Sequence, residues 1–68
     1  YRSEIIETFV IENIRAVARM EVEIEIHEKL RNQELDSKKY EALDRKLTTL
    51  RTTLEDLKTR QKILNELK

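Results

Sequence analysis

The stretch MEVEIEIHEKL, Met20 to Leu30, is compatible with two structures, and the fold depends on which of them forms. From Met20 to Ile26 apolar residues alternate with glutamates, which is the period of a half-buried strand. A strand would need a partner strand, and no other part of the chain has that pattern. A helical pattern leads into the stretch without glycine or proline. We therefore expect a helix, with an intermolecular ribbon of strands as the alternative.

The C-terminal half repeats apolar residues at alternating spacings of three and four, which is the heptad pattern of a coiled coil. Position a holds Tyr40, Leu47, Leu54 and Gln61, and position d holds Leu43, Leu50, Leu57 and Leu64. This pattern predicts a helix over about 38–67. Asp36 or Ser37 is expected to cap its start, because their side-chain oxygens accept hydrogen bonds from free backbone N–H groups.

The N-terminal half carries two apolar stripes, which predict a wider amphipathic helix over about 3–32. The first, called here the seam stripe, contains Ile6, Val10, Asn13, Val17, Met20, Ile24 and His27. The second, called the outer row, contains Ile11, Ala18, Val22, Ile26 and Leu30. At about 100° per residue the two stripes point in different directions, so each needs its own neighbour. We expect the seam stripe to pack on the second helix and the outer row on another copy or another protein.

A polar connector over about 33–37 joins the two predicted helices. The expected fold is all-α, an antiparallel two-helix hairpin, coiled-coil-like, that assembles into a helical bundle or ring. Each arm of thirty residues is about 45 Å long. The hairpin forms one domain over 1–68, and because the first residue is Tyr1 rather than methionine, we expect a segment of a longer protein.

Size and composition point to self-association and away from catalysis. A chain of 68 residues buries little apolar surface alone, and it has no cysteine for disulfides and only one histidine. Glycine is absent, so no phosphate-binding loop is possible, and no Ser-His-Asp or Cys-His set is present. We expect no catalytic residue, no cofactor, no metal site and no small-molecule substrate.

Polar residues in the seam are expected to set how the helices align. Asn13 is predicted to be a buried residue that specifies register or copy number, and Gln61 a similar residue near the chain end. His27 lies four residues after Glu23, which could suit a metal, but a histidine packed in the seam is the simpler interpretation. Predicted partners across the seam are Glu21 with Arg51 and Glu23 with Lys46, if the chain folds back near residues 34–35.

Charge limits the expected partners. Lysine and arginine number 14, aspartate and glutamate also 14, so the net charge is zero, without the basic surplus typical of nucleic-acid-binding domains. A local basic cluster remains at the start of the second helix, formed by Lys38, Lys39, Arg45 and Lys46. Repeated in an oligomer, it could form a rim that contacts nucleic acid. No apolar run reaches the length of a membrane span and no signal peptide is visible, so we expect a cytoplasmic protein.

Two known layouts resemble this chain. FVIENIRAVARMEVEIEIHEKL, a polar connector and YEALDRKLTTLRTTLEDLKTRQKIL are similar in arrangement to the two-helix oligomerisation core of phage small terminase subunits. That resemblance implies a homo-oligomerisation module of a phage-encoded DNA-packaging protein, although the helix-turn-helix DNA-binding domain of the family is not in this chain. Plasmid copy-control RNA-binding proteins, which are dimeric four-helix bundles, resemble it in size. Non-enzymatic assembly is our prediction; nucleic-acid binding or a coiled-coil adaptor for a different partner are the alternatives.

Overall fold

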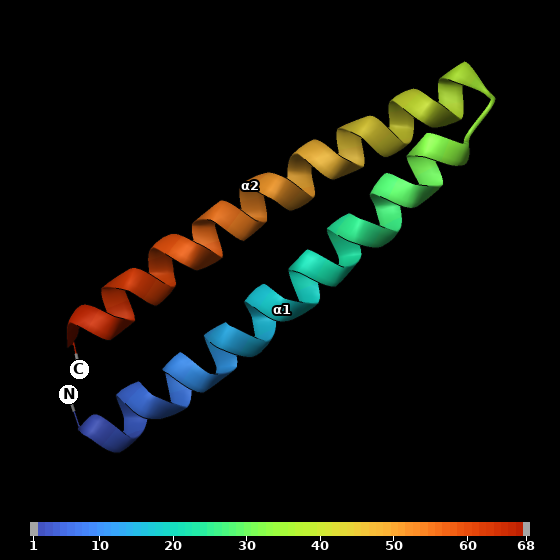
Figure 1. Cartoon of the computed structure of the whole chain (residues 1–68). Helices are drawn as coiled ribbons and strands as arrows, with labels where there is room; N and C mark the ends of the chain where they lie inside the picture. Colours follow the sequence, from blue (N-terminus) through green and yellow to red (C-terminus); the bar gives the residue numbers. More distant parts are fainter. Residues whose placement is uncertain (1, 68) are drawn as a thin grey trace.

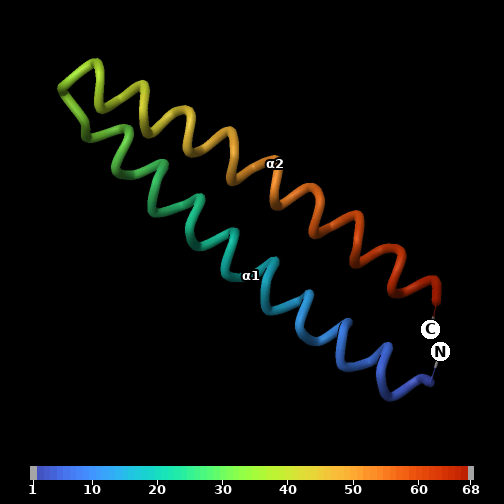
Figure 2. Tube along the Cα trace, turned by 180° about the vertical axis from the view of Figure 1, so that it is seen from behind, coloured from blue at the N-terminus to red at the C-terminus, as the bar shows by residue number. Residues whose placement is uncertain are grey.

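The computed structural model describes residues 2–67 and consists of two long antiparallel helices (Figure 1). Helix α1 spans Ser3–Gln33 and helix α2 spans Ser37–Leu67, with residues 34–36 between them. The two helices lie side by side along their whole length, also when seen from behind (Figure 2). Tyr1 and Lys68, the ends of the predicted domain, lie outside the described residues. The all-α antiparallel hairpin is confirmed.

The stretch from Met20 to Leu30 lies in the middle of α1 and is helical throughout. Its alternation therefore marks two edges of one helix. Ile24 is buried and Met20 packs beside it, whereas Val22 is 54% exposed and Ile26 is 46% exposed. No residue among 2–67 forms a strand, so the intermolecular ribbon has no counterpart in this structure.

A carboxylate organises the short connector without any glycine. Asp36 Oδ1 accepts hydrogen bonds from the backbone N–H groups of Lys38 at 2.9 Å and Lys39 at 3.2 Å, which caps α2 as predicted. The Glu34 carboxylate accepts the Asp36 N–H at 3.1 Å, and the Glu34 N–H closes α1 on the Arg31 carbonyl. Because Glu34 has an extended backbone, the chain reverses without a positive φ at any described residue.

The core is a thin apolar seam between the two helices. Its centre is formed by Ile24, Leu47 and Leu50, with Met20 and Leu54 packed against it. Ile6 and Val10 are buried nearer the chain ends. Asn13, also in the seam, is buried as well. Six further seam residues are half-buried: Val17, His27, Leu43, Leu57, Gln61 and Leu64. The seam stripe and the leucine heptads therefore meet as predicted.

Tyr40 departs from the heptad pattern. Although it occupies the first a position, it is 42% exposed. Across the seam stands Arg31 rather than an apolar residue, and its guanidinium carbon lies 5.9 Å from the centre of the Tyr40 ring. The last layer before the connector is therefore a cation–π contact instead of an apolar one.

The predicted pairing of Glu21 with Arg51 is wrong. Arg51 Nη2 instead lies 2.9 Å from Glu28 Oε1. Side chains of a helix lean towards its N-terminus, so Arg51 leans towards the connector, where Glu28 lies, and away from Glu21. The other predicted pair, Glu23 with Lys46, does not come within 4.0 Å among the described residues, and Glu23 lies beside His27 instead.

Candidate functional site

The outer row of α1 remains uncovered in the hairpin. All five of its residues are exposed, with exposed fractions of 52% for Ile11 and 49% for Leu30. Ala18 and Val22 border a shallow hollow of about 430 Å³ on this side of α1. Each step of four residues advances the row about 40° around the helix, so it winds from the back of α1 to the edge of the seam at Leu30. Only at Leu30 does the row border residues of α2, which are Lys39, Ala42 and Leu43.

One edge of the seam is closed by charge over the part nearer the connector. This ion-paired flank is formed by Glu28, Arg31, Asp44 and Arg51. Arg31 Nη1 donates to Asp44 Oδ1 at 2.8 Å, and Arg51 Nη2 donates to Glu28 Oε1 at 2.9 Å. Asp44 and Arg51 each follow a d residue, and such side chains flank a coiled-coil seam on one side. The Arg31 side chain is only 20% exposed, and its Nε is buried without a hydrogen-bond partner.

The opposite edge of the seam is open. It is lined on α1 by Phe9, Ala16 and Leu30, which each directly precede an a-type residue. Residues that precede a lie on one edge of a coiled-coil seam, and residues that follow d lie on the other edge. Two apolar grooves lie along this open flank. The terminal groove, of about 450 Å³, is lined by Phe9, Glu12, Asn13, Ala16, Leu57, Arg60 and Leu64. The connector groove, of about 360 Å³, is lined by Leu30, Glu34, Lys39, Ala42 and Leu43.

Asn13 joins the two helices from inside the seam. It is 5% exposed, and its Nδ2 donates to the Leu57 carbonyl at 2.8 Å and to Gln61 Oε1 at 2.9 Å. Gln61 Nε2 in turn donates to Asn65 Oδ1 at 3.2 Å. Both amide protons of Asn13 are thus used within the hairpin, where they align α1 with α2. The prediction that Asn13 specifies copy number is untested by these contacts.

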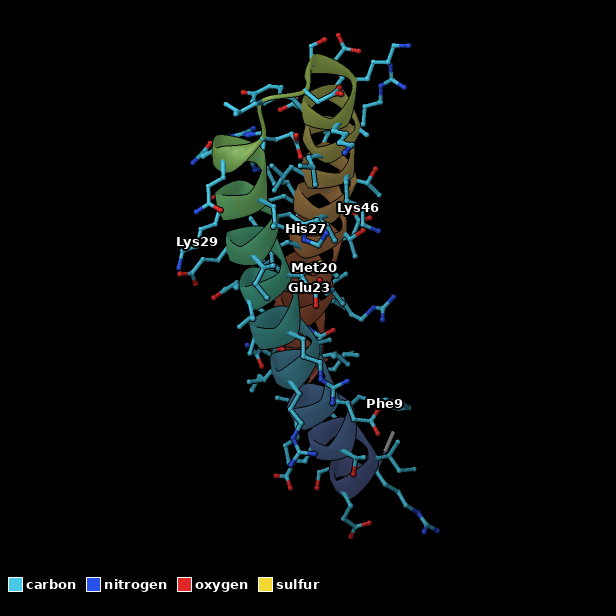
Figure 3. The ribbon with its side chains drawn as sticks, turned by 90° about the vertical axis from the view of Figure 1, so that its right-hand side faces the viewer. Phe9, Met20, Glu23, His27, Lys29 and Lys46 are labelled. Atoms are coloured by element: carbon cyan, nitrogen blue, oxygen red, sulfur yellow. The ribbon has the colours of Figure 1, made fainter. Side chains whose placement is uncertain are left out.

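His27 has its partners within its own helix. Its Nδ1 lies 2.7 Å from the Glu23 carbonyl oxygen, which can only accept, so Nδ1 carries the proton. Glu23 Oε2 is 3.8 Å from the same nitrogen. Met20, Glu23 and His27 lie on the side of α1 that faces α2, whereas Lys29 points outward (Figure 3). Within residues 2–67, no three His, Cys, Asp or Glu side chains are grouped to hold a metal ion.

The basic cluster is fully on the surface. Lys38, Lys39, Arg45 and Lys46 are all exposed. Because they are spaced one and seven residues apart, they occupy one side of the first turns of α2. None of the four lies within 4.0 Å of an acidic oxygen in the described part of the chain. Four free cations on one side of a helix can attract a polyanion.

Sequence reasoning missed the open flank and the contacts of Arg31 in the ion-paired flank. Ala16 carried a usable signal, since one small residue beside a seam of larger ones leaves space. Arg31 carried another, because it continues the seam stripe four residues after His27. Its partners Asp44 and Tyr40 come from the other helix and depend on the register.

Neither helix described within residues 2–67 has an apolar segment long enough to cross a membrane. Comparison with protein-family models, with curated proteins and with solved structures finds no match to this chain.

Proposed function

We propose that this chain is a non-enzymatic assembly module, a helical hairpin that binds further copies of itself. One observation carries the proposal: the seam stripe of α1 is covered by α2, while the outer row on the same helix stays about half exposed. Ile11, Val22, Ile26 and Leu30 are large apolar side chains, and contiguous exposed apolar surface marks interaction sites. Covering each of them further would contribute roughly 1 kcal/mol.

The small core supports the same proposal. Only five apolar residues are buried in the described chain: Ile6, Val10, Ile24, Leu47 and Leu50. Chains of this size usually need disulfides, a metal or oligomerisation for stability, and this one has no cysteine. Association would therefore stabilise the hairpin and hold any domains attached to it in a fixed geometry.

Solution mass tests the proposal. We expect sedimentation or light scattering to give a multiple of 8.2 kDa that rises with concentration. Thermal unfolding should shift to higher temperature over the same concentrations, because folding and association are linked. A helical monomer at every concentration would exclude self-association and favour an adaptor for a different protein.

A role in DNA packaging is a narrower proposal. Its support is the resemblance in layout to the oligomerisation core of phage small terminase subunits, with two long helices and a polar connector. In that setting the hairpin would be the intracellular assembly core of a phage protein, and DNA contacts would come from flanking domains or from the basic cluster.

Nucleic-acid binding by the hairpin itself is the second candidate function. The observation in its favour is the exposed basic cluster of Lys38, Lys39, Arg45 and Lys46. Binding to duplex DNA or to RNA should weaken steeply with salt and be lost when all four are changed to alanine. A matched control changes Lys58 and Lys62, two exposed lysines further along α2. Absence of binding at low salt would exclude this function.

A further inference from the structure

We infer that a second copy docks on the open flank, with α1 of each copy on α2 of the other and both connectors at the same end. The result is a four-helix bundle with a two-fold axis parallel to the helices. This inference rests on the proposed self-association and adds one pair of surfaces that meet, with their orientation. Ile11, Ala18 and Val22 of the outer row lie outside this contact and stay free to join one dimer to another.

The two flanks differ in what they can accept. On the ion-paired flank, Arg31 with Asp44 and Arg51 with Glu28 already span the seam at 2.8 and 2.9 Å. On the open flank, no ion pair within 4.0 Å links the two helices among residues 2–67. There the seam is accessible through the terminal and connector grooves, which have apolar floors. Because these grooves open the seam towards both ends of the hairpin, we place the buried apolar side chains of the interface on the open flank.

The open flank has room for a stable contact. The hairpin extends 51 × 14 × 11 Å between Cα atoms. A face of 51 by 14 Å covers about 700 Å² per copy, close to the roughly 800 Å² per partner of a standard interface. Both helices contribute exposed apolar residues along or beside this face. These residues are Ile5, Phe9, Ile26, Leu30, Ala42, Ile63 and Leu67.

Charge selects which helix faces which. Helix α1 has seven acidic and four basic residues, net −3, whereas α2 has five acidic and eight basic residues, net +3. On the open flank, α1 presents Glu12, Arg19 and Glu23, net −1. On the same flank, α2 presents Lys39, Lys46, Asp56 and Arg60, net +2. Placing α1 on α2 of the second copy therefore brings opposite charges together along the interface.

The competing arrangement places α1 on α1 of the second copy, antiparallel, with connectors at opposite ends. An alignment centred between Val17 and Ala18, near the middle of α1, would set Glu12 of each copy against Glu23 of the other. Like charges facing each other in an interface oppose that arrangement.

A two-fold axis parallel to the helices places residues of the two copies that lie at the same height along the bundle next to each other. Phe9 of one copy then meets the terminal groove of the other, where Leu57 and Leu64 form the floor and Ala16 leaves space. Leu30 meets the connector groove beside Ala42 and Leu43. Glu12 lies at the height of Arg60 of the second copy, and these two residues do not pair within 4.0 Å in their own chain.

Disulfide trapping tests the orientation, because the chain has no cysteine of its own. Two single variants, Glu12→Cys and Arg60→Cys, are mixed, oxidised and weighed by intact-mass spectrometry. We expect the unlike disulfide dimer as the main product. A second mixture, of Glu12→Cys and Glu23→Cys, should give little disulfide dimer that joins the two different variants. The opposite result, trapping between Glu12→Cys and Glu23→Cys only, would overturn the inference.

Charge reversal supplies a second test that does not need oxidation. Arg60→Glu should raise the dimer dissociation constant about tenfold, since two equivalent contacts change by symmetry. Adding Glu12→Arg to the same chain should return the dissociation constant to its wild-type value. Glu21→Arg, on the edge of α1 next to the ion-paired flank, is the control and should leave it within about twofold.

The outcomes separate this inference from the proposed function. A wild-type chain that stays monomeric contradicts the proposed self-association itself. An oligomer that responds equally to Arg60→Glu and to Glu21→Arg, without rescue by Glu12→Arg, keeps the proposed function and contradicts docking on the open flank. Circular dichroism of each variant shows whether the helices are intact.

Discussion

Asn13 Nδ2 lies 2.9 Å from Gln61 Oε1, although the two residues are 48 positions apart in the chain. The same nitrogen donates to the Leu57 carbonyl at 2.8 Å. The side chain of Asn13 is thus a polar link between α1 and α2 near the chain ends, where it and Gln61 lie among apolar seam residues. Buried polar pairs of this kind favour one alignment of helices over its neighbours.

Replacing this amide by a carboxylate should destabilise the hairpin. In Asn13→Asp, the oxygen that replaces Nδ2 would face the Leu57 carbonyl oxygen and Gln61 Oε1, so a buried charge would meet two acceptors in place of donors. We expect the free energy of unfolding to fall by about 2 kcal/mol, measured by urea titration of helicity. Asn65→Asp is the control, because Asn65 is exposed and should change it by less than about 0.5 kcal/mol. Equal losses in both would mean that the Asn13 amide does not link the helices.

Leu47 is the most buried side chain of the core, with no exposed surface. Leu47→Ala should cost about 3 kcal/mol, because it removes packing against Ile24 and leaves a cavity. Leu35→Ala, at a connector leucine that is 99% exposed, should cost less than about 0.5 kcal/mol. Thermal unfolding at matched concentration compares the two. Similar losses for both leucines would contradict a core centred on Leu47.

The two interhelical ion pairs should differ in strength. Arg31 is 20% exposed and also contacts the Tyr40 ring, so Arg31→Ala should lower the free energy of unfolding by about 1–2 kcal/mol. Arg51 is 50% exposed, and Arg51→Ala should lower it by less than about 1 kcal/mol, with most of that loss screened at high salt. Urea titrations at low and high salt measure both. A larger effect at Arg51 than at Arg31 would contradict this ranking.

The two sides of α1 should respond differently to a new charge. Val17→Asp, in the half-buried seam, should lower the free energy of unfolding by about 3 kcal/mol. Val22→Asp, at a residue that is 54% exposed, should leave the helicity intact and lower the mass of the assembly towards that of the open-flank dimer. Helicity and solution mass are measured on the same samples. A Val22→Asp chain with unchanged stability and unchanged mass would contradict a role for the outer row.

Much of the hairpin could be predicted because its patterns are local. Glycine and proline are absent, and apolar spacings of three and four run through both halves, which predicts helices without knowledge of their partners. The cap at Asp36 could be predicted for the same reason, since its carboxylate binds N–H groups two and three residues away. The two apolar stripes of α1 followed from helical geometry alone, and the structure places one in the seam and leaves the other exposed.

Contacts between the helices were harder to predict, because they depend on register and on side-chain direction. Arg51 had acidic candidates at Glu21 and Glu28, one heptad apart, and the sequence pattern does not distinguish them. The lean of Arg51 towards the connector selects Glu28, and the close contact of Arg31 with Asp44 completes that flank.

Helix formation, the identity of the seam and the presence of a second apolar side on α1 were thus determined by residue spacing, because each repeats with the period of a single helix. The tertiary structure alone decided that one flank is closed by Arg31 and Arg51 while the other stays open at Phe9, Ala16 and Leu30. The physical reason is that ion pairs and grooves arise between helices, where a shift of one turn in the packing changes every partner.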